Sequence, residues 1–290
     1  MNNPKISIII PTYNHAQELP KCLDSVFAQT ILPPLTPPCK GGESIEVIVV
    51  NDGSTDRTED VLRGYCKDKT LPRLYGGELK IITQPNQGAP VARNNGFKIS
   101  RGEYLLFCDA DALLRKDALE KMVGVLELKK GRFKAQGILH GKPHPYPPIK
   151  GEGTMQIGFV YPNHKFGRKA FRIFPFDEKK LKENNYIHTM ALIKREAFPK
   201  EGFDPNLKKF QDWDLWLAML ENGYKGVWLD EFLFTCRPRD KKTKGKFLPK
   251  SSWLPSFMHK IPWKKFGIKI KVIEDYEYWR DVVLRKHRLL

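Results

Sequence analysis

The sequence of 290 residues predicts an α/β protein built on an open, mainly parallel central sheet flanked by helices. Short apolar runs alternate with amphipathic helical patterns over the first 130 residues. Polar motifs follow directly after these runs, where an open parallel sheet binds its ligands. Hydrophobic residues make up 41% of the chain, which is enough to bury a core and excludes wholesale disorder.

The expected elements follow in chain order. Four runs have the length and two-sided apolar character of buried parallel strands: Ile6–Ile10, Glu46–Val50, Lys80–Thr83 and Tyr104–Cys108. Two sets of apolar residues each fall on one helical face: Leu19, Cys22, Leu23, Val26 and Phe27, then Leu119, Met122, Val123 and Leu126. Asp56 followed by Glu59 resembles a helix start. In the less regular second half we expect a loop leading into a strand over 185–193, a helix from Asp212 and a last strand over Val227–Phe234.

We expect one domain over residues 1–236, followed by a basic, aromatic extension over 237–290. Two proline- and glycine-rich stretches, PPCKGGE at 37–43 and PPIKGEG at 147–153, predict low-complexity loop insertions near 31–44 and 141–153. Net charge is +17, and twelve lysines and arginines but one acid, Asp240, lie between Arg237 and Val272. Basic residues interleaved with aromatic ones suit an anionic membrane surface. They equally suit a solvated flap over the site; no nucleic-acid partner is expected, since no nucleic-acid module is recognised.

The sequence favours a cytoplasmic protein. The N-terminus has no secretory signal pattern, and no apolar run has the length of a membrane span. Five scattered cysteines without a C-x-x-C pair are typical of reduced thiols. The basic extension adds the expectation of a peripheral position on the inner face of the membrane.

The strongest chemical signal is Asp109-Ala110-Asp111, directly after the strand YLLFC. Two carboxylates one residue apart can bind a hard cation such as Mg²⁺ or Mn²⁺, which then bridges the phosphates of a nucleotide. The alternative is that one Asp caps the next helix and the other is solvated, because an isolated Asp-x-Asp is a common sequence.

Two further turns end neighbouring strands. Pro11, Thr12, Tyr13 and Asn14 offer a hydroxyl, a ring and an amide where a base and ribose could rest. In NDGSTD over 51–56, Asp52 could accept a hydrogen bond from a base, and the glycine after it permits close backbone approach. The alternative for each motif is an Asx or Ser/Thr turn that opens a helix, which is the commoner fate of such residues.

Two other side chains are candidates for the site. Arg93, in PNQGAPVARNNG, is expected on a helix, where it could pair with a phosphate or support the metal carboxylates, or be a surface charge. Asp212, in QDWD, is a carboxylate beside large apolar rings, which suits a general base. The alternative is that Asp212 is the helix N-cap.

Taken together, IIIPTYN, EVIVVNDGSTD, NQGAPVARNNG, LLFCDAD and QDWDLWL resemble the family 2 glycosyltransferases of the GT-A (Rossmann-like) fold. The resemblance runs from about Ile6 to Leu220, interrupted by the two insertions. It implies an inverting, metal-dependent transferase that moves a sugar from a nucleotide diphosphate sugar, with a UDP-sugar favoured, to a hydroxyl acceptor. A role in cell-surface polysaccharide or glycolipid synthesis, with an acceptor that could be lipid-linked, is also implied.

The resemblance also implies residue roles. Pro11–Asn14 and Asp52 hold the nucleotide, joined by Arg93 and by Asp109 and Ala110. Asp109 and Asp111 serve the ribose and the divalent metal, and Asp212 deprotonates the acceptor hydroxyl. The stretch 187–192 matches acceptor-binding residues of the family, so His188 could contact the acceptor or a donor phosphate, with a structural histidine as the alternative. Trp213 is also expected on the acceptor side.

The chain departs from the family pattern at three positions. Ala112 follows the Asp-x-Asp where another Asp is frequent, Asn51 replaces a frequent Asp, and Gln211 replaces the usual Glu. These departures concern the fine ligand geometry. Two other classes compete: a nucleotidyltransferase, although its Gly-rich phosphate loop is missing after the first strand, and a non-catalytic protein that binds a nucleotide sugar or lipid head group.

Overall fold

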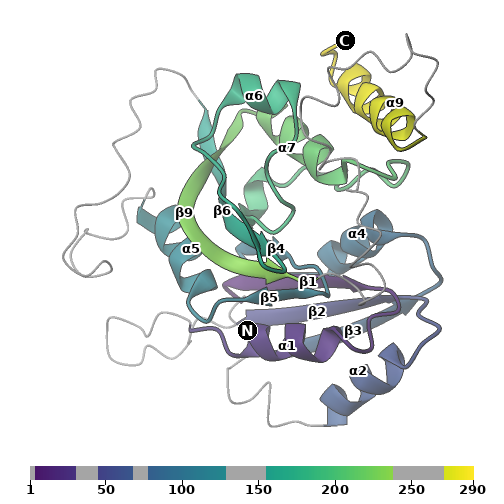
Figure 1. Cartoon of the computed structure of the whole chain (residues 1–290). Coiled ribbons are helices and arrows are strands. Elements are labelled where there is room, and N and C mark those ends of the chain that lie inside the picture. The colour runs from purple at the N-terminus through teal and green to yellow at the C-terminus, as the bar shows by residue number, and fades with distance from the viewer. Residues whose placement is uncertain (1–3, 31–44, 68–77, 129–154, 238–270) are drawn as a thin grey trace.

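The computed structural model describes residues 4–30, 45–67, 78–128, 155–237 and 271–290 (Figure 1). Both expected insertions, near 31–44 and 141–153, lie outside these ranges. Most of the basic segment, residues 238–270, also lies outside them. Within them, nine strands form one curled sheet in the order β3-β2-β1-β4-β8-β6-β9-β5, with β7 paired to β6.

The first half of the sheet is parallel and contains all four predicted strands. It consists of β1 (Ile6–Thr12), β2 (Ile45–Asp52), β3 (Glu78–Gln84) and β4 (Tyr104–Phe107). Strand β1 is central, pairing with β2 through Ile8 opposite Val47 and with β4 through Ile8 opposite Leu106. The shared parallel direction brings the carboxyl ends of β1, β2 and β4 to one edge, which is where the predicted motifs lie.

The second half mixes strand directions. It contains β5 (Ala112–Leu114), β6 (Gln156–Phe166), β7 (Lys169–Phe171), β8 (Leu192–Lys194) and β9 (Tyr224–Cys236). β8 is antiparallel to β4 and to β6, β9 is parallel to β6, and β5 and β7 form antiparallel edges. The sheet is therefore mainly parallel where the motifs lie and mixed beyond β4.

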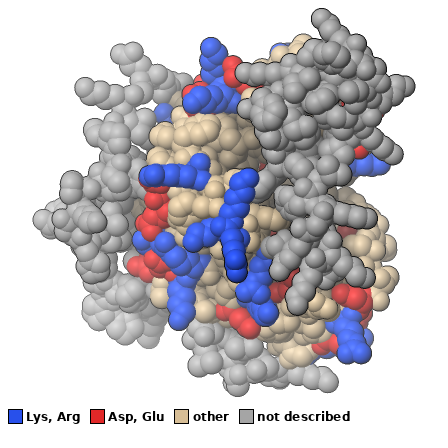
Figure 2. Space-filling model, viewed as in Figure 1, with Lys and Arg blue, Asp and Glu red and all other residues tan. Residues whose placement is uncertain are grey.

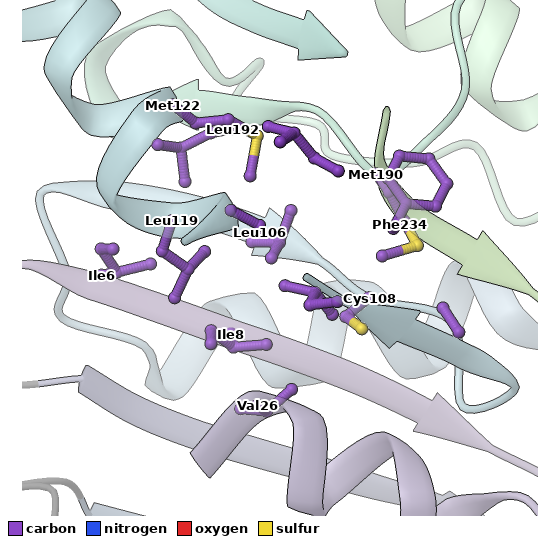
Figure 3. Packing of buried hydrophobic residues seen from close by; sticks show 14 of the residues in the cluster. Ile6, Ile8, Val26, Leu106, Cys108, Leu119, Met122, Met190, Leu192 and Phe234 are labelled. Atoms are coloured by element: carbon purple, nitrogen blue, oxygen red, sulfur yellow. The ribbon is translucent and has the colours of Figure 1, made fainter. Parts of the chain in front are cut away.

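Helices cover both faces of the sheet. One face carries α1 (Leu19–Phe27), α2 (Thr58–Lys67) and α5 (Ala118–Leu128); the other carries α4 (Ala89–Ile99) and α7 (Gln211–Glu221). Alternate side chains of β1 point to the two faces of the sheet. Ile8 packs on the side of α1 and α5, and Ile9 packs on the side of α4. Figure 3 shows the first face, where Val26, Leu119 and Met122 from the helices surround Ile8 and Leu106.

Short elements and a C-terminal helix complete the described chain. They are α6 (Glu178–Glu183), a 3₁₀ turn (Arg195–Ala197) and α9 (Lys271–Lys286). Helix α9 lies beside α7 (Figure 1), and its Val283 and Leu284 belong to the core of that face. The C-terminal part of the expected extension is thus packed on the domain. Among the described helices, none combines the length and apolarity that a bilayer crossing requires.

Candidate active site

Asn14 joins the turns after β1 and β2. Its side-chain oxygen Oδ1 accepts hydrogen bonds from the backbone N–H groups of Thr55 (2.7 Å) and Asp56 (3.2 Å), and its own N–H donates to Ser54 Oγ at 3.0 Å. Its φ of 55° lies in the left-handed region, where Asn is better tolerated than most residues. Asn14 therefore fixes the relative position of the two loops that the sequence assigned to the nucleotide.

Asp52 organises the loop that leads into α4. The carboxylate is buried and accepts from Gln84 Nε2 (2.8 Å), from the N–H of Gln87 (2.9 Å) and from the N–H of Gly88 (2.8 Å). The neighbouring Gly53 has φ 70°, and a Cβ there would lie 2.8 Å from a backbone nitrogen of the same loop. The group that approaches Gly53 closely is the protein's own loop, and the approach of a nucleotide to this backbone stays a prediction.

The other residues of the first turn line the same edge. Thr12 is buried, and its hydroxyl has no hydrogen-bond partner among the described residues. The ring of Tyr13 is exposed, with 39% of its surface accessible. A buried unpaired hydroxyl beside an exposed ring is suited to contact a ligand.

Arg93 connects three predicted motifs: its own motif after β3, the Asp-x-Asp loop after β4, and the QDWD turn that begins α7. It lies on helix α4, as predicted. Its side chain is buried and donates to Asp109 Oδ1 (3.1 Å) and to Gln211 Oε1 (3.0 Å). Its guanidinium also lies 5.2 Å from the centre of the Phe203 ring. Arg93 is therefore not an ordinary surface charge, because it supports a predicted metal carboxylate.

Asp109 and Asp111 lie in the short loop between β4 and β5. The backbone carbonyl of Asp109 accepts from the N–H of Ala112 at 2.9 Å, and that of Asp111 accepts from the N–H of Arg237 at 3.1 Å. Ala110 between them is buried. In the described part of the chain, no group of three or more His, Cys, Asp or Glu side chains is arranged to hold a metal ion alone.

His188 is the next polar side chain beyond Asp109. Its Nε2 is 3.9 Å from Asp109 Oδ2, and its Nδ1 accepts a hydrogen bond from the N–H of Met190 at 3.2 Å. Because Nδ1 is an acceptor, the neutral ring carries its proton on Nε2. His188 thus presents a hydrogen-bond donor to the side of Asp109 that Arg93 does not contact.

Asp212 occupies the first turn of α7. The N-cap of this helix is Phe210, with φ 60°, so the alternative that Asp212 is the N-cap is wrong. Asp212 Oδ1 accepts from the N–H of Trp213 at 3.0 Å. Trp213 itself is 1% exposed, and its indole donates to the Leu181 carbonyl at 2.6 Å, so its ring packs in the core.

Two features of the site region were missed by sequence reasoning. His164 on β6 lies with its ring centre 5.0 Å from that of His188, and burial and the neighbouring His188 lower the pKa of His164 to about 3. Asp214 on α7 is buried, and its Oδ1 lies 2.9 Å from Nε2 of His287, the residue that follows α9. Both contacts join residues far apart in the chain, and no local pattern could have revealed them.

The fold and the site's residues match a known family. Residues 7–202 match the family described as glycosyl transferase family 2. The match covers well over half of the chain, including the turns after β1 and β2, Arg93, and both aspartates of the Asp-x-Asp. The chain belongs to glycosyl transferase family 2.

Curated relatives agree with this assignment. An uncharacterised glycosyltransferase of Rickettsia typhi is 29% identical over 83% of this chain and 66% of its own length. The putative teichuronic acid biosynthesis glycosyltransferase TuaG of Bacillus subtilis is 27% identical over 79% of this chain and 77% of its own. Several relatives are longer: the chain spans 66% of the Rickettsia protein and 30% of the putative glycosyltransferase EpsH of Bacillus subtilis.

Solved structures share the fold. TarS 1–349 of S. aureus in complex with UDP-GlcNAc has a TM-score of 0.58 at 17% identity, covering 85% of this chain and 62% of TarS 1–349. The mannosyltransferase PcManGT of Pyrobaculum calidifontis, in complex with GDP-Man and Mn²⁺, has a TM-score of 0.55 at 19% identity, covering 100% of this chain and 74% of its own. These similarities confirm the predicted glycosyltransferase fold.

Proposed function

We propose that this protein transfers a glycosyl group from a nucleotide diphosphate sugar to a hydroxyl acceptor, with inversion at the anomeric carbon. The observation that carries the proposal is the link from Asp109 through Arg93 to Gln211. This link joins the predicted diphosphate site to the helix turn that bears Asp212. A single displacement needs one protein group at the leaving group and one at the nucleophile. One buried side chain, Arg93, contacts the first, Asp109, and the neighbour of the second, Asp212.

The nucleotide lies over the edge formed by β1, β2 and β4. Its contacts come from eight residues: Pro11, Thr12, Tyr13, Asn14, Asp52, Arg93, Asp109 and Ala110. The unpaired Thr12 hydroxyl and the exposed Tyr13 ring support a ligand there. A UDP-sugar is the favoured donor, which fits the UDP-GlcNAc complex of TarS. The mannosyltransferase PcManGT has GDP-Man bound, so the nucleobase of the donor has to be determined by experiment.

Asp109 and Asp111 are the residues that would hold a divalent metal, Mn²⁺ or Mg²⁺. Carboxylate oxygens are the ligands that these cations prefer, and Arg93 orients the Asp109 carboxylate through Oδ1. Two carboxylates suit a metal that shares its coordination with the donor's phosphates. The bound metal would supply positive charge that stabilises the departing diphosphate.

Asp212 is the general base. It removes the proton from the acceptor hydroxyl as that oxygen forms a bond to the anomeric carbon. The bond between the anomeric carbon and the diphosphate oxygen breaks on the opposite side, and the nucleoside diphosphate leaves with the electron pair. His188 binds the acceptor or the donor phosphate through Nε2–H, while the core position of Trp213 leaves that side chain out of the acceptor contacts.

The biological setting is cell-surface polysaccharide or glycolipid synthesis in the cytoplasm, at the inner face of the membrane. The name of TuaG, a relative in teichuronic acid biosynthesis, supports the first of these. Residues 1–236 form the catalytic domain, and 237–290 form an extension whose helix α9 is anchored on α7. The basic residues of this extension are the proposed contact with anionic lipid.

The test measures nucleoside diphosphate release from UDP-GlcNAc, UDP-glucose and GDP-mannose, with and without Mn²⁺, using water as the acceptor. We expect slow, Mn²⁺-dependent release from one base class, lost in Asp111→Asn. Binding without any release by the wild type would favour the non-catalytic alternative. Release of pyrophosphate from a nucleoside triphosphate and a sugar phosphate would favour a nucleotidyltransferase.

A further inference from the structure

The first turn of α7 is held by two residues at the end of α9. Asp214, two residues after the proposed base Asp212, is buried in this turn. Its Oδ1 lies 2.9 Å from Nζ of Lys286, the last residue of α9, and 2.9 Å from Nε2 of His287. A buried carboxylate needs a paired charge and hydrogen bonds, so Lys286 and His287 are what keeps Asp214 inside the protein.

Both side chains contact a second carboxylate as well. His287 Nδ1 lies 2.8 Å from Oε1 of Glu221, the last residue of α7, so its ring bridges the first turn and the end of that helix. Because ionised carboxylates only accept, the ring donates from both nitrogens. Lys286 Nζ also donates to Oδ2 of Asp204, in the loop that leads into α7, at 2.8 Å. The two residues therefore tie α7 to the loop before it.

The contact between Lys286 and Asp214 is more than a surface ion pair. Lysine and arginine side chains gather in the middle of the face shown in Figure 2, where they lie on the surface. Lys286 differs because its ammonium group donates to two carboxylates, and one of them, Asp214, is only 3% exposed. Exposed ion pairs contribute little to stability, whereas the loss of one partner from a buried pair is costly. Lys286 therefore constrains where the first turn of α7 can lie.

Helix α9 also contacts the residue that precedes α7. The Tyr276 ring of α9 packs edge-on against the ring of Phe210, with the two ring centres 5.1 Å apart. Phe210 is the N-cap of α7, and its φ of 60° is a left-handed conformation that persists only where the surrounding structure supports it. Asp212 lies between Phe210 and Asp214, the two residues at which the contacts of α9 and His287 hold the start of the helix.

We propose that Lys286 and His287 are positioning residues of the transferase, which act through Asp214 to hold the first turn of α7 so that Asp212 faces the acceptor hydroxyl. The inference rests on the proposed function, because it concerns the base of that reaction. Without the two side chains, Asp214 would be a buried, unpaired carboxylate, and the turn would shift to bring it to water. A displacement of about 1 Å at a catalytic group can lower the rate by about a hundredfold.

The test measures kcat and KM for nucleoside diphosphate release in Mn²⁺, with whichever of UDP-GlcNAc, UDP-glucose and GDP-mannose the wild type hydrolyses. Rates are referred to folded protein. Lys286→Met/His287→Ala should lower kcat by about tenfold or more, because the base is displaced. KM for the donor should stay within about twofold, because Asp109 keeps its contact with Arg93.

Single variants keep the test decisive if the double variant does not fold. Lys286→Met should lower kcat, and Lys286→Arg, which keeps the charge, should restore most of it. Arg285→Met removes a charge from an exposed position of the same helix and should turn over as the wild type does.

An unchanged kcat in folded Lys286→Met and in the folded double variant would overturn the inference, since the end of α9 would then contribute stability alone. A rise in donor KM that accounts for the lost activity would also overturn it, because these residues would then act on the donor site. A wild type that hydrolyses none of the three donors would fail the proposed function itself, so the two failures are distinguishable.

Discussion

Arg93 and Asp109 form an ion pair between α4 and the loop after β4, with Arg93 Nη2 3.1 Å from Asp109 Oδ1. The arginine side chain is 9% exposed, and its other terminal nitrogen contacts Gln211. A planar guanidinium can hold both partners at once, whereas a lysine ammonium is a single point charge. The amide oxygen of Gln211 satisfies the arginine without adding a second negative charge beside Asp109.

Arg93→Lys should therefore weaken metal-dependent nucleotide binding by about 10- to 100-fold, the usual cost of removing a residue that orients a metal ligand. Calorimetric titration with Mn²⁺ and the cognate nucleoside diphosphate measures the effect. Arg57→Lys, an exposed position at the start of α2, is the matched control. Unchanged affinity in Arg93→Lys would show that Asp109 does not need this support.

Asp212→Asn should lower kcat by about 10²- to 10⁴-fold, the range that general-base catalysis supplies. Nucleotide affinity should stay within about twofold, because Asp212 acts on the acceptor. The measurement is nucleoside diphosphate release at saturating donor, with the exposed Asp60→Asn as control. Wild-type turnover in Asp212→Asn would remove Asp212 from the role of base.

Asn14 should be costly to replace, because it combines a left-handed backbone with four hydrogen bonds to the second loop. Asn14→Gly loses the side-chain bonds and should reduce the free energy of unfolding by about 1 kcal/mol. Asn14→Ala adds backbone strain of about 1 kcal/mol or more. Urea unfolding of both variants separates the two effects, and equal stability of the Gly and Ala variants would contradict the strain.

His287 should make the stability depend on pH. Burial alone would lower its pKa, but the hydrogen bonds that its ring donates to Asp214 and Glu221, together with the negative charges of these carboxylates, outweigh burial and raise the pKa above the ordinary value of 6.5. A raised pKa stabilises the folded state below about pH 6.5, and this contribution is lost as pH rises through the folded-state value. His164 has the opposite effect: because its pKa is lowered in the folded protein, the folded state gains stability as the pH rises toward 6.5.

The free energy of unfolding of wild type and His287→Gln should therefore differ most at pH 6 and converge above neutral pH. Urea unfolding at pH 6, 7 and 8.5 measures the difference, and His164 cancels because it is present in both proteins. A gap that is constant across this range would mean that His287 contributes packing rather than charge.

The parallel half of the fold could be predicted because its signals are local. Runs such as EVIVV are apolar on both faces, and the helical faces of α1 and α5 repeat every three or four residues. Because parallel strands end at the same edge of a sheet, the predicted motifs were expected to lie together at that edge. The link from Asp109 to Gln211 through Arg93 agrees with that expectation.

The second half could not be predicted in the same way. β6 contains Pro162 and His164 and pairs with β9 through three register shifts, so its alternation is broken. β5, β7 and β8 have three residues each, too short for a periodic pattern. The docking of α9 depends on Asp214 and His287, which lie 73 positions apart, and only the folded chain brings them together.

The central claim is that Asp109 and Asp111 serve a divalent metal that binds with a nucleoside diphosphate. The most direct measurement is calorimetric titration with UDP, GDP and dTDP, each with Mn²⁺ and with EDTA, on wild type and Asp111→Asn. We predict that one nucleotide binds wild type in Mn²⁺, and that binding weakens at least tenfold in EDTA and in the variant. Failure of the folded wild-type protein to bind any of the three with Mn²⁺ would contradict the claim.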